Sequence, residues 1–148
     1  MRAVVQRVGN AHVAIDGAIK GAIEAGFVVF LGIGRDDTDA EIERLWSKIF
    51  KLRIFADGDK PTGATLSDIG GNVLIISQFT LYADCRKGNR PSFVEAGSPE
   101  HAEALYEYIV ERCRERVPVV QTGSFGEEME VSLLNHGPFT IILDSDKL

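Results

Sequence analysis

The hydrophobic period of the chain changes at Thr38, and this change limits the fold more than any other feature of the sequence. Before Thr38, short apolar runs separated by turn residues are typical of strands. The expected strands lie at 3–8, 12–15, 18–23 and 27–33. Asp16-Gly17 separates the second run from the third and predicts a two-residue hairpin turn, because both residues tolerate positive φ angles. A chain that begins in this way folds around a sheet.

After this point a helical period begins. Thr38 and Glu41 form the pattern of a capping box, in which each side chain satisfies a free backbone N–H group. The apolar residues that follow are spaced by three and four, which predicts a helix to about Lys51. These residues are Ile42, Leu45, Trp46 and Ile49. Ser98 as N-cap and Pro99 at the first helical position predict the start of a second helix.

The rest of the chain predicts further strands joined by loops. We expect strands near 52–55, 72–79, 128–134 and 139–143, a polar loop over 57–63, a loop over 82–92 and a turn over 135–138. The predicted fold class is therefore α+β, a mostly antiparallel sheet or barrel-like domain with two main helices. Its length of 148 residues fits a single domain spanning 1–148.

Composition excludes several classes of protein. Two cysteines do not make a disulfide framework, and the N-terminal segment has no signal-peptide pattern. The apolar run over 27–33 is far shorter than the roughly 20 residues that span a bilayer. A net charge of −6 argues against a protein that binds nucleic acid over its whole surface. We expect a soluble, cytoplasmic domain that does not associate with membranes.

The usual patterns of hydrolytic and metal chemistry are missing. His12, His101 and His136 lack the spacing of a metal motif, so no metal site is expected. Cys85 lies beside Arg86, which favours a thiolate, but no paired base accompanies it. The sequence has no nucleophile elbow and no phosphate-binding glycine loop, so it does not support a hydrolase with a Ser-His-Asp triad.

Three segments carry polar residues where an apolar strand or a plain turn would suffice. Ser77–Tyr82 places polar groups at the end of a buried run, where they need partners or a ligand, unless the strand simply runs into solvent. Residues 85–90 hold Arg86, Lys87 and Arg90 and no acidic residue, which suits phosphate contact or a solvated loop. Asn135–Thr140 contains Gly-Pro between two strands, which is also compatible with an ordinary tight turn.

Together, in this order and spacing, the three segments resemble the D-aminoacyl-tRNA deacylases. The resemblance begins at Met1–Val8 and covers essentially the whole chain. Its most specific parts are Ser77–Tyr82, Asp84–Phe93, and Asn135 with Gly137, Pro138 and Thr140. The chain departs from the family pattern at His136, a position where members commonly carry an acidic residue.

The resemblance implies an enzyme of translation quality control. Such a protein hydrolyses the ester that joins a D-amino acid to the terminal adenosine of tRNA, and it also clears glycine from alanine tRNA. It implies a homodimer with active sites at the interface, binding of the acceptor end, and neither metal nor organic cofactor. A competing hypothesis is a binding domain for RNA or protein that keeps the fold without turnover.

The resemblance also assigns roles to residues. Backbone N–H groups near Phe79 and Thr80 would stabilise the negative charge that develops on the ester carbonyl, and Ser77 and Gln78 would position the substrate. Thr80 would act as the nucleophile, or the 2′-hydroxyl of the tRNA would activate water instead. A threonine without a neighbouring base is a poor nucleophile, which favours the second mechanism.

Chiral selection is assigned to the Gly-Pro pair. The resemblance implies a Gly137–Pro138 bond in the cis form, inserted into the pocket of the other subunit to exclude L side chains. It places Arg7 behind that turn and Phe125 and Met129 near the pocket. The segment with Arg86, Lys87 and Arg90 would contact the tRNA, and we expect this binding to be weak and sensitive to salt.

Overall fold

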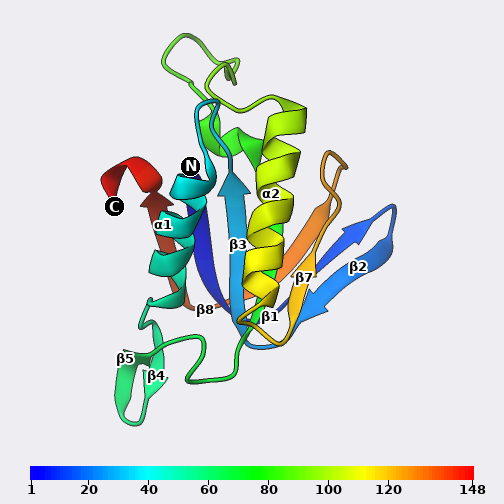
Figure 1. Ribbon diagram of the computed structural model, residues 1–148. Coiled ribbons are helices and arrows are strands. Elements are labelled where there is room, and N and C mark those ends of the chain that lie inside the picture. The colour runs from blue at the N-terminus through cyan, green and yellow to red at the C-terminus, as the bar shows by residue number, and fades with distance from the viewer.

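The computed structural model describes residues 1–148 as a six-stranded sheet covered on one face by two helices, with a small hairpin below it (Figure 1). The strands are β1 (Arg2–Ile15), β2 (Ala18–Ile23), β3 (Gly26–Gly32), β4 (Phe55–Asp57), β5 (Lys60–Ala64), β6 (Asn72–Ser77), β7 (Val120–Thr122) and β8 (Glu130–Asp144). The helices are α1 (Asp39–Phe50) and α2 (Pro99–Arg114), with short 3₁₀ helices η1 (Phe79–Tyr82) and η2 (Ser145–Lys147).

The sheet is organised around its first strand. β1 pairs antiparallel with β2, β3 and β8, whereas the β3–β6 and β6–β7 pairs are parallel. The sheet curls between β2 and β7, so that these two end strands lie close to each other. A Cβ built at Gly21 in β2 would lie 3.0 Å from the carbonyl oxygen of Thr122 in β7. The α+β class, the two main helices and the barrel-like sheet are confirmed.

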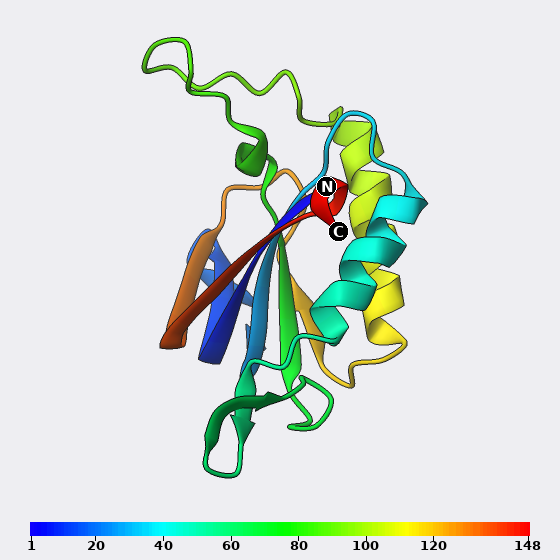
Figure 2. The same cartoon turned by 90° about the vertical axis from the view of Figure 1, so that its left-hand side faces the viewer.

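The predicted hairpin is confirmed, but the strands around it are longer than expected. Asp16 and Gly17 have φ angles of 49° and 76°, as a turn of this kind requires. Two of the predicted runs form one strand, β1, and the turn expected over 135–138 lies inside β8. These two long strands pair with each other along their lengths, and shifts in register between Gln6 and Ala11 absorb the extra residues. Both strands bend sharply there (Figure 2).

Both helices begin as predicted. The Thr38 Oγ1 accepts a hydrogen bond from the Ala40 N–H at 3.3 Å, and the Glu41 carboxylate accepts one from the Thr38 N–H at 2.9 Å. The predicted apolar stripe of α1 is fully buried against the sheet: Ile42, Leu45, Trp46 and Ile49. In α2 the Ser98 Oγ accepts from the His101 N–H, and Pro99 occupies the first turn. Neither helix has the length and apolar character needed to cross a membrane.

Several short elements differ from the prediction. The strand expected near 52–55 is β4, which begins only at Phe55, and the loop expected over 57–63 contains β5. The three-residue strand β7 was not predicted. The strand expected over 72–79 ends at Ser77, and Phe79 begins η1. Such short segments take their structure from the strand they pair with, which local periodicity does not reveal.

The core has two parts. The larger part lies between the sheet and the two helices, and it includes Phe27, Leu31 and Ile75. The smaller part covers the other face of the sheet: Val8, Ala11, Val13, Ile23, Val28, Leu74 and Ile76. Strands β3 and β6 are buried on both faces, as the continuous apolar run of β3 predicts. η1 follows β6 in the chain and begins beside the carboxyl end of β3.

Candidate functional site

The segment after β6 leaves the sheet and turns into a short helix. The Gln78 N–H still donates to the Leu31 carbonyl at 2.7 Å, which extends the contact with β3 by one residue. The first hydrogen bond of η1 then runs from the Leu81 N–H to the Gln78 carbonyl at 3.2 Å. Because the first N–H groups of a helix have no partner within it, those of Phe79 and Thr80 have none inside η1. The helix therefore presents two backbone donors at its start.

A pocket of about 430 Å³ lies beside this helix start. Three elements contribute: the end of β6 with η1, the start of α2, and the segment between β7 and β8. The lining residues are Ile76, Ser77, Gln78, Phe79, Gly97, Pro99, Ala102, Phe125, Gly126, Glu127, Met129 and Val131. The structure thus brings together five residues that the sequence proposed for the site: Ser77, Gln78, Phe79, Phe125 and Met129.

Thr80 lies next to this pocket but not in its wall. Its side chain is exposed, and its Oγ1 accepts a hydrogen bond from the Gln78 Nε2 at 2.5 Å. No histidine or carboxylate forms a hydrogen bond with Thr80. A neutral amide does not take a proton from a hydroxyl, so this environment supplies no base for a threonine nucleophile. His101 lies near the start of α2, and its Nε2 is buried without a partner.

Some residues in and around the site were not predicted from the sequence. Phe79 is 55% exposed and packs edge-on against Phe93, with ring centroids 4.9 Å apart. Gly97, just before α2, and Ala102, within it, line the pocket, yet neither carries a sequence signal because small apolar residues occur throughout a fold. Met129 closes tightly over Gly123, where an added Cβ would lie 2.2 Å from its sulfur. Only the fold brings these residues to one place.

The Gly-Pro turn is a second, separate feature. The peptide bond between Gly137 and Pro138 is cis, and both residues are exposed. The turn is held from both sides, because Asn135 Oδ1 accepts from the Phe139 N–H at 2.8 Å and the Arg7 Nε donates to the His136 carbonyl at 2.9 Å. The backbone of His136 therefore has a defined partner, while its side chain is exposed.

Arg7 connects this turn to the rest of the molecule. Its guanidinium also donates to the carbonyl of Ile54 and, at 3.4 Å, to that of Pro61, and it lies 4.9 Å from the centre of the Phe139 ring. Gly137 has a φ of +138°, and an added Cβ there would lie 2.9 Å from the Arg7 Nη2. The geometry agrees with the predicted place of Arg7 behind the turn.

The structure does not bring the turn and the pocket together within one chain. The turn lies opposite Arg7, in the middle of β1, whereas η1 contacts Arg2 at the start of that strand. Five residues of extended strand place these two backbone positions about 17 Å apart. The bend that carries the turn lies at the end of the molecule away from η1 (Figure 2). Within one chain, therefore, the turn and the pocket are separate features.

The basic segment is less positive than its sequence indicates. The Arg86 guanidinium binds the Asp84 carboxylate at 2.8 and 2.7 Å, and this holds the pKa of Asp84 to about 2. Asp84 also pairs through its backbone with Ser92, which closes the base of the loop. Lys87 and Arg90 remain exposed without an ion-pair partner. These two residues are the free cations of the segment.

The remaining candidates do not gather into a reactive cluster. Cys85 is exposed and Cys113 is buried, and neither forms a disulfide. Burial raises the pKa of the Cys113 thiol, which keeps it neutral. No three side chains of histidine, cysteine, aspartate or glutamate meet in a way that would hold a metal ion.

A family model, curated relatives and a solved structure each match this chain over nearly its whole length. The model of the family described as D-Tyr-tRNA(Tyr) deacylase matches residues 4–144. D-aminoacyl-tRNA deacylases of Thermosipho melanesiensis and Thermotoga petrophila are 51% and 52% identical, and each match covers 100% of this chain and 99% of the relative. A solved structure named c-Myc DNA Unwinding Element Binding Protein superposes with a TM-score of 0.92 at 39% identity, covering 97% of this chain and 98% of that one.

Proposed function

This chain belongs to the D-Tyr-tRNA(Tyr) deacylase family, and we propose that it hydrolyses D-aminoacyl esters of tRNA in the pocket beside η1. The reaction adds water to the ester carbonyl, passes through a tetrahedral intermediate and releases the D-amino acid from the terminal ribose. The observation that carries the proposal is the start of η1, where two backbone N–H groups without intrahelical partners adjoin a pocket of about 430 Å³. Such donors stabilise the oxyanion of the intermediate.

Most of the catalysis, in this proposal, comes from the position of the groups around the ester and from their electrostatics. The N–H groups of Phe79 and Thr80 bind the developing oxyanion, and Ser77 and Gln78 orient the amino group and the ribose. An aminoacyl ester is already reactive, so this contribution is sufficient. Since the only partner of the Thr80 hydroxyl is an amide, the tRNA 2′-hydroxyl is the better group to activate water.

Chiral selection, in this proposal, comes from a second copy of the chain. The exposed Gly137-Pro138 turn of the partner enters the pocket and points its carbonyl oxygens at the side of the α-carbon that carries hydrogen in a D-amino acid. An L side chain would collide with these oxygens, whereas varied D side chains point outward. Glycine has hydrogen on both sides, so glycine on alanine tRNA is also a substrate.

The dimer is supported by what the chain leaves exposed. Ile142 and Leu134 on β8 are 77% and 60% exposed, and Phe79 at the pocket is also exposed. The outer edge of β8 pairs with no other strand of the chain. Exposed apolar side chains along a free strand edge suit a second copy of this protein. The dimer would bring the turn of one copy to the pocket of the other.

We further propose that Lys87 and Arg90 contact the acceptor end of the tRNA. An acidic body with a small basic segment binds weakly and releases its product, as an enzyme that inspects many tRNAs must do. Two cysteines without a disulfide fit a cytoplasmic location.

The deciding experiment compares the two enantiomers of the substrate. Purified protein should release tyrosine from D-Tyr-tRNA and leave L-Tyr-tRNA intact. Equal rates on both would rule out chiral editing. Binding of tRNA without any release would favour a binding domain, the class suggested by the name of the structural neighbour.

A second experiment separates the two mechanisms. Thr80→Ala should keep most of the activity, whereas D-Tyr-tRNA with a 2′-deoxy terminal adenosine should not be hydrolysed. Thr65→Ala, which alters a threonine just after the β4–β5 hairpin, is the matched control. The reverse pattern would identify Thr80 as the nucleophile.

A further inference from the structure

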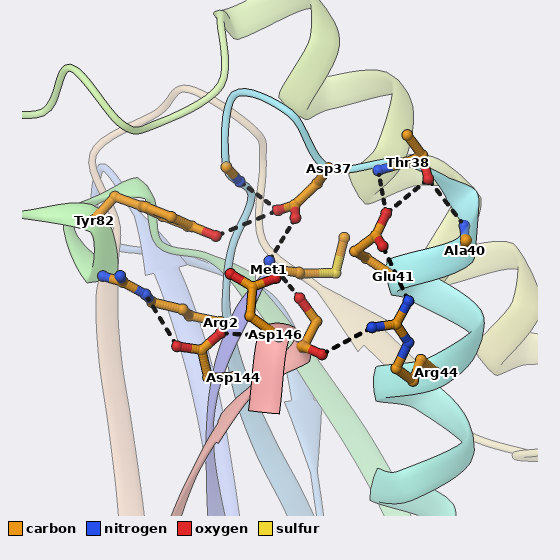
Figure 3. A network of polar contacts seen from close by, with 12 residues as sticks. Met1, Arg2, Asp37, Thr38, Ala40, Glu41, Arg44, Tyr82, Asp144 and Asp146 are labelled. Carbon is orange, nitrogen blue, oxygen red and sulfur yellow. Dashed lines mark hydrogen bonds and ion pairs between the residues drawn. The ribbon is translucent and has the colours of Figure 1, made fainter. Parts of the chain in front are cut away.

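A buried polar network lies beside η1 and reaches it at Tyr82 (Figure 3). Its centre is Asp37, whose residue is only 7% exposed. The Asp37 carboxylate accepts hydrogen bonds from the Met1 α-amino group at 2.5 Å, the Gly34 N–H at 2.6 Å and the Tyr82 hydroxyl at 3.4 Å. The amino group also donates to the Ser145 Oγ at 2.7 Å. A charge this deeply buried persists only with such partners.

The network reaches η1 through its last two residues. The Arg2 Nη1 donates to the Leu81 carbonyl at 2.9 Å, and the Arg2 guanidinium lies 4.4 Å from the centre of the Tyr82 ring. Asp37 holds the hydroxyl of the same tyrosine. Burial and the Asp37 charge raise the pKa of Tyr82, so its hydroxyl remains a donor. The carboxyl end of η1 is thus fixed by two charged groups from other parts of the chain.

Two glycines let η1 approach the sheet closely enough for these contacts. A Cβ at Gly32 would lie 2.9 Å from the Leu81 Cβ, and one at Gly34 would lie 2.6 Å from the Tyr82 hydroxyl. Larger residues would therefore lift η1 away from Arg2 and Asp37. The helix contains only four residues, so fixing its end also fixes the donors at its start.

We propose that Arg2 and Asp37 are positioning residues that hold η1 so that the N–H groups of Phe79 and Thr80 point at the ester carbonyl. This inference rests on the proposed role of η1 in the hydrolysis. Neither side chain lines the pocket, and both act through the backbone or the tyrosine of η1. A displacement of the donors by about 1 Å lowers the rate of the chemical step by as much as about 100-fold.

Tyr82→Phe and Arg2→Ala test this role with Arg44→Met as the matched control. Arg44 belongs to the same network, since it donates to the Ser145 carbonyl at 3.1 Å, but it does not contact η1. With D-Tyr-tRNA, we expect Tyr82→Phe to lower kcat about tenfold and Arg2→Ala to lower it more, each with little change in KM. Arg2→Lys retains a donor for Leu81 and should recover part of the loss. Arg44→Met should keep the wild-type kcat.

Amide hydrogen exchange gives a readout that does not depend on activity. The Leu81 and Ala83 amides, which donate to the Gln78 and Thr80 carbonyls, should exchange faster in Tyr82→Phe and Arg2→Ala than in Arg44→Met. A loss of kcat that follows thermal stability equally in all three variants, or unchanged exchange of these two amides, would overturn the positioning role. If the wild-type protein released no tyrosine from D-Tyr-tRNA while exchange responded as expected, the proposed hydrolysis would be wrong. Arg2 and Asp37 would still be shown to hold η1 in place.

Discussion

Arg2 and Arg7, at the two ends of the first half of β1, each hold an irregular segment of the chain, but in different surroundings. At one end Arg2 binds the Leu81 carbonyl in η1, and at the other Arg7 binds the His136 carbonyl in the Gly-Pro turn. Each arginine fixes an irregular segment through its backbone, because a guanidinium has several donors in a rigid fork. The Arg2 end rests on a buried ionic network, whereas the Arg7 end supports a turn that faces solvent.

The difference in burial between the Arg2 end and the Arg7 end suits different roles for η1 and the Gly-Pro turn. A segment that must hold donors against a developing charge is fixed from within the chain. The Gly-Pro turn is held by Arg7 and Asn135, yet Gly137 and Pro138 are exposed, so the turn is available to the second copy that the proposed dimer requires.

The sharpest way to test the buried end is Asp37→Asn. Removing one partner of a buried pair leaves the Met1 amino group without its counter-charge, so we expect a loss of about 3–5 kcal/mol in the free energy of unfolding. Urea denaturation measures this loss. Asp84→Asn, in the exposed pair with Arg86, is the control and should leave the unfolding midpoint unchanged. A midpoint equal to wild type in Asp37→Asn would refute the described network.

The exposed end is tested by Gly137→Ala. An alanine at a φ of +138°, with its Cβ against the Arg7 Nη2, should cost about 1–3 kcal/mol of stability and displace the turn. We expect the ratio of D-Tyr-tRNA to L-Tyr-tRNA hydrolysis to fall. Gly9→Ala is the control, because its Cβ would lie at an ordinary 3.5 Å from the nearest Leu134 carbon. Undiminished discrimination in Gly137→Ala would separate the turn from chiral selection.

The basic segment gives a smaller effect that depends on salt. Lys87→Gln should weaken tRNA binding and reduce the slope of log K against log salt by about 0.7–0.9, the value for one phosphate contact. Arg86→Gln should change the slope less, because Asp84 already occupies its guanidinium. Titrations at several salt concentrations measure both slopes. Equal slopes for the two variants would contradict the pairing.

The smallest effect concerns alkaline pH. The pKa of Tyr82 is raised in the folded state, so its contribution to stability is complete below about pH 10, the pKa of an unfolded tyrosine, and declines above it. Tyr82→Phe removes this contribution. Unfolding experiments from pH 9 to 11 should find wild-type stability falling faster than that of the variant. Parallel curves would mean that Tyr82 is not held as described.

Local chemistry explains which elements could be predicted from the sequence. Asp16-Gly17 and the Thr38 capping box act within a few residues, and both are confirmed. The Ser98-Pro99 helix start is confirmed for the same reason. Elements that exist only through distant partners were missed, namely β5, β7 and the continuity of β8 through Gly137-Pro138.

The site divides in the same way. Polar residues after a buried apolar strand marked Ser77 and Gln78 only as unusual, and the resemblance to the deacylases assigned them and Phe79 to the site; all three line the pocket. The wall from α2 and the Arg2–Asp37 network are tertiary contacts between residues far apart in the sequence. The ion pair between Arg86 and Asp84 also depends on loop geometry, which charge counting does not reveal.

The most direct test of the central claim is a mixed dimer. One copy carries Gln78→Ala, which alters the pocket, and the other carries Gly137→Ala, which alters the turn. If the pocket of one copy is completed by the turn of the other, the mixed dimer has one intact site. It should hydrolyse D-Tyr-tRNA at about half the wild-type rate and reject L-Tyr-tRNA. If each pocket instead uses the turn of its own chain, one pocket per dimer keeps an altered turn, and hydrolysis of L-Tyr-tRNA at about half the rate of the Gly137→Ala homodimer would contradict a shared site.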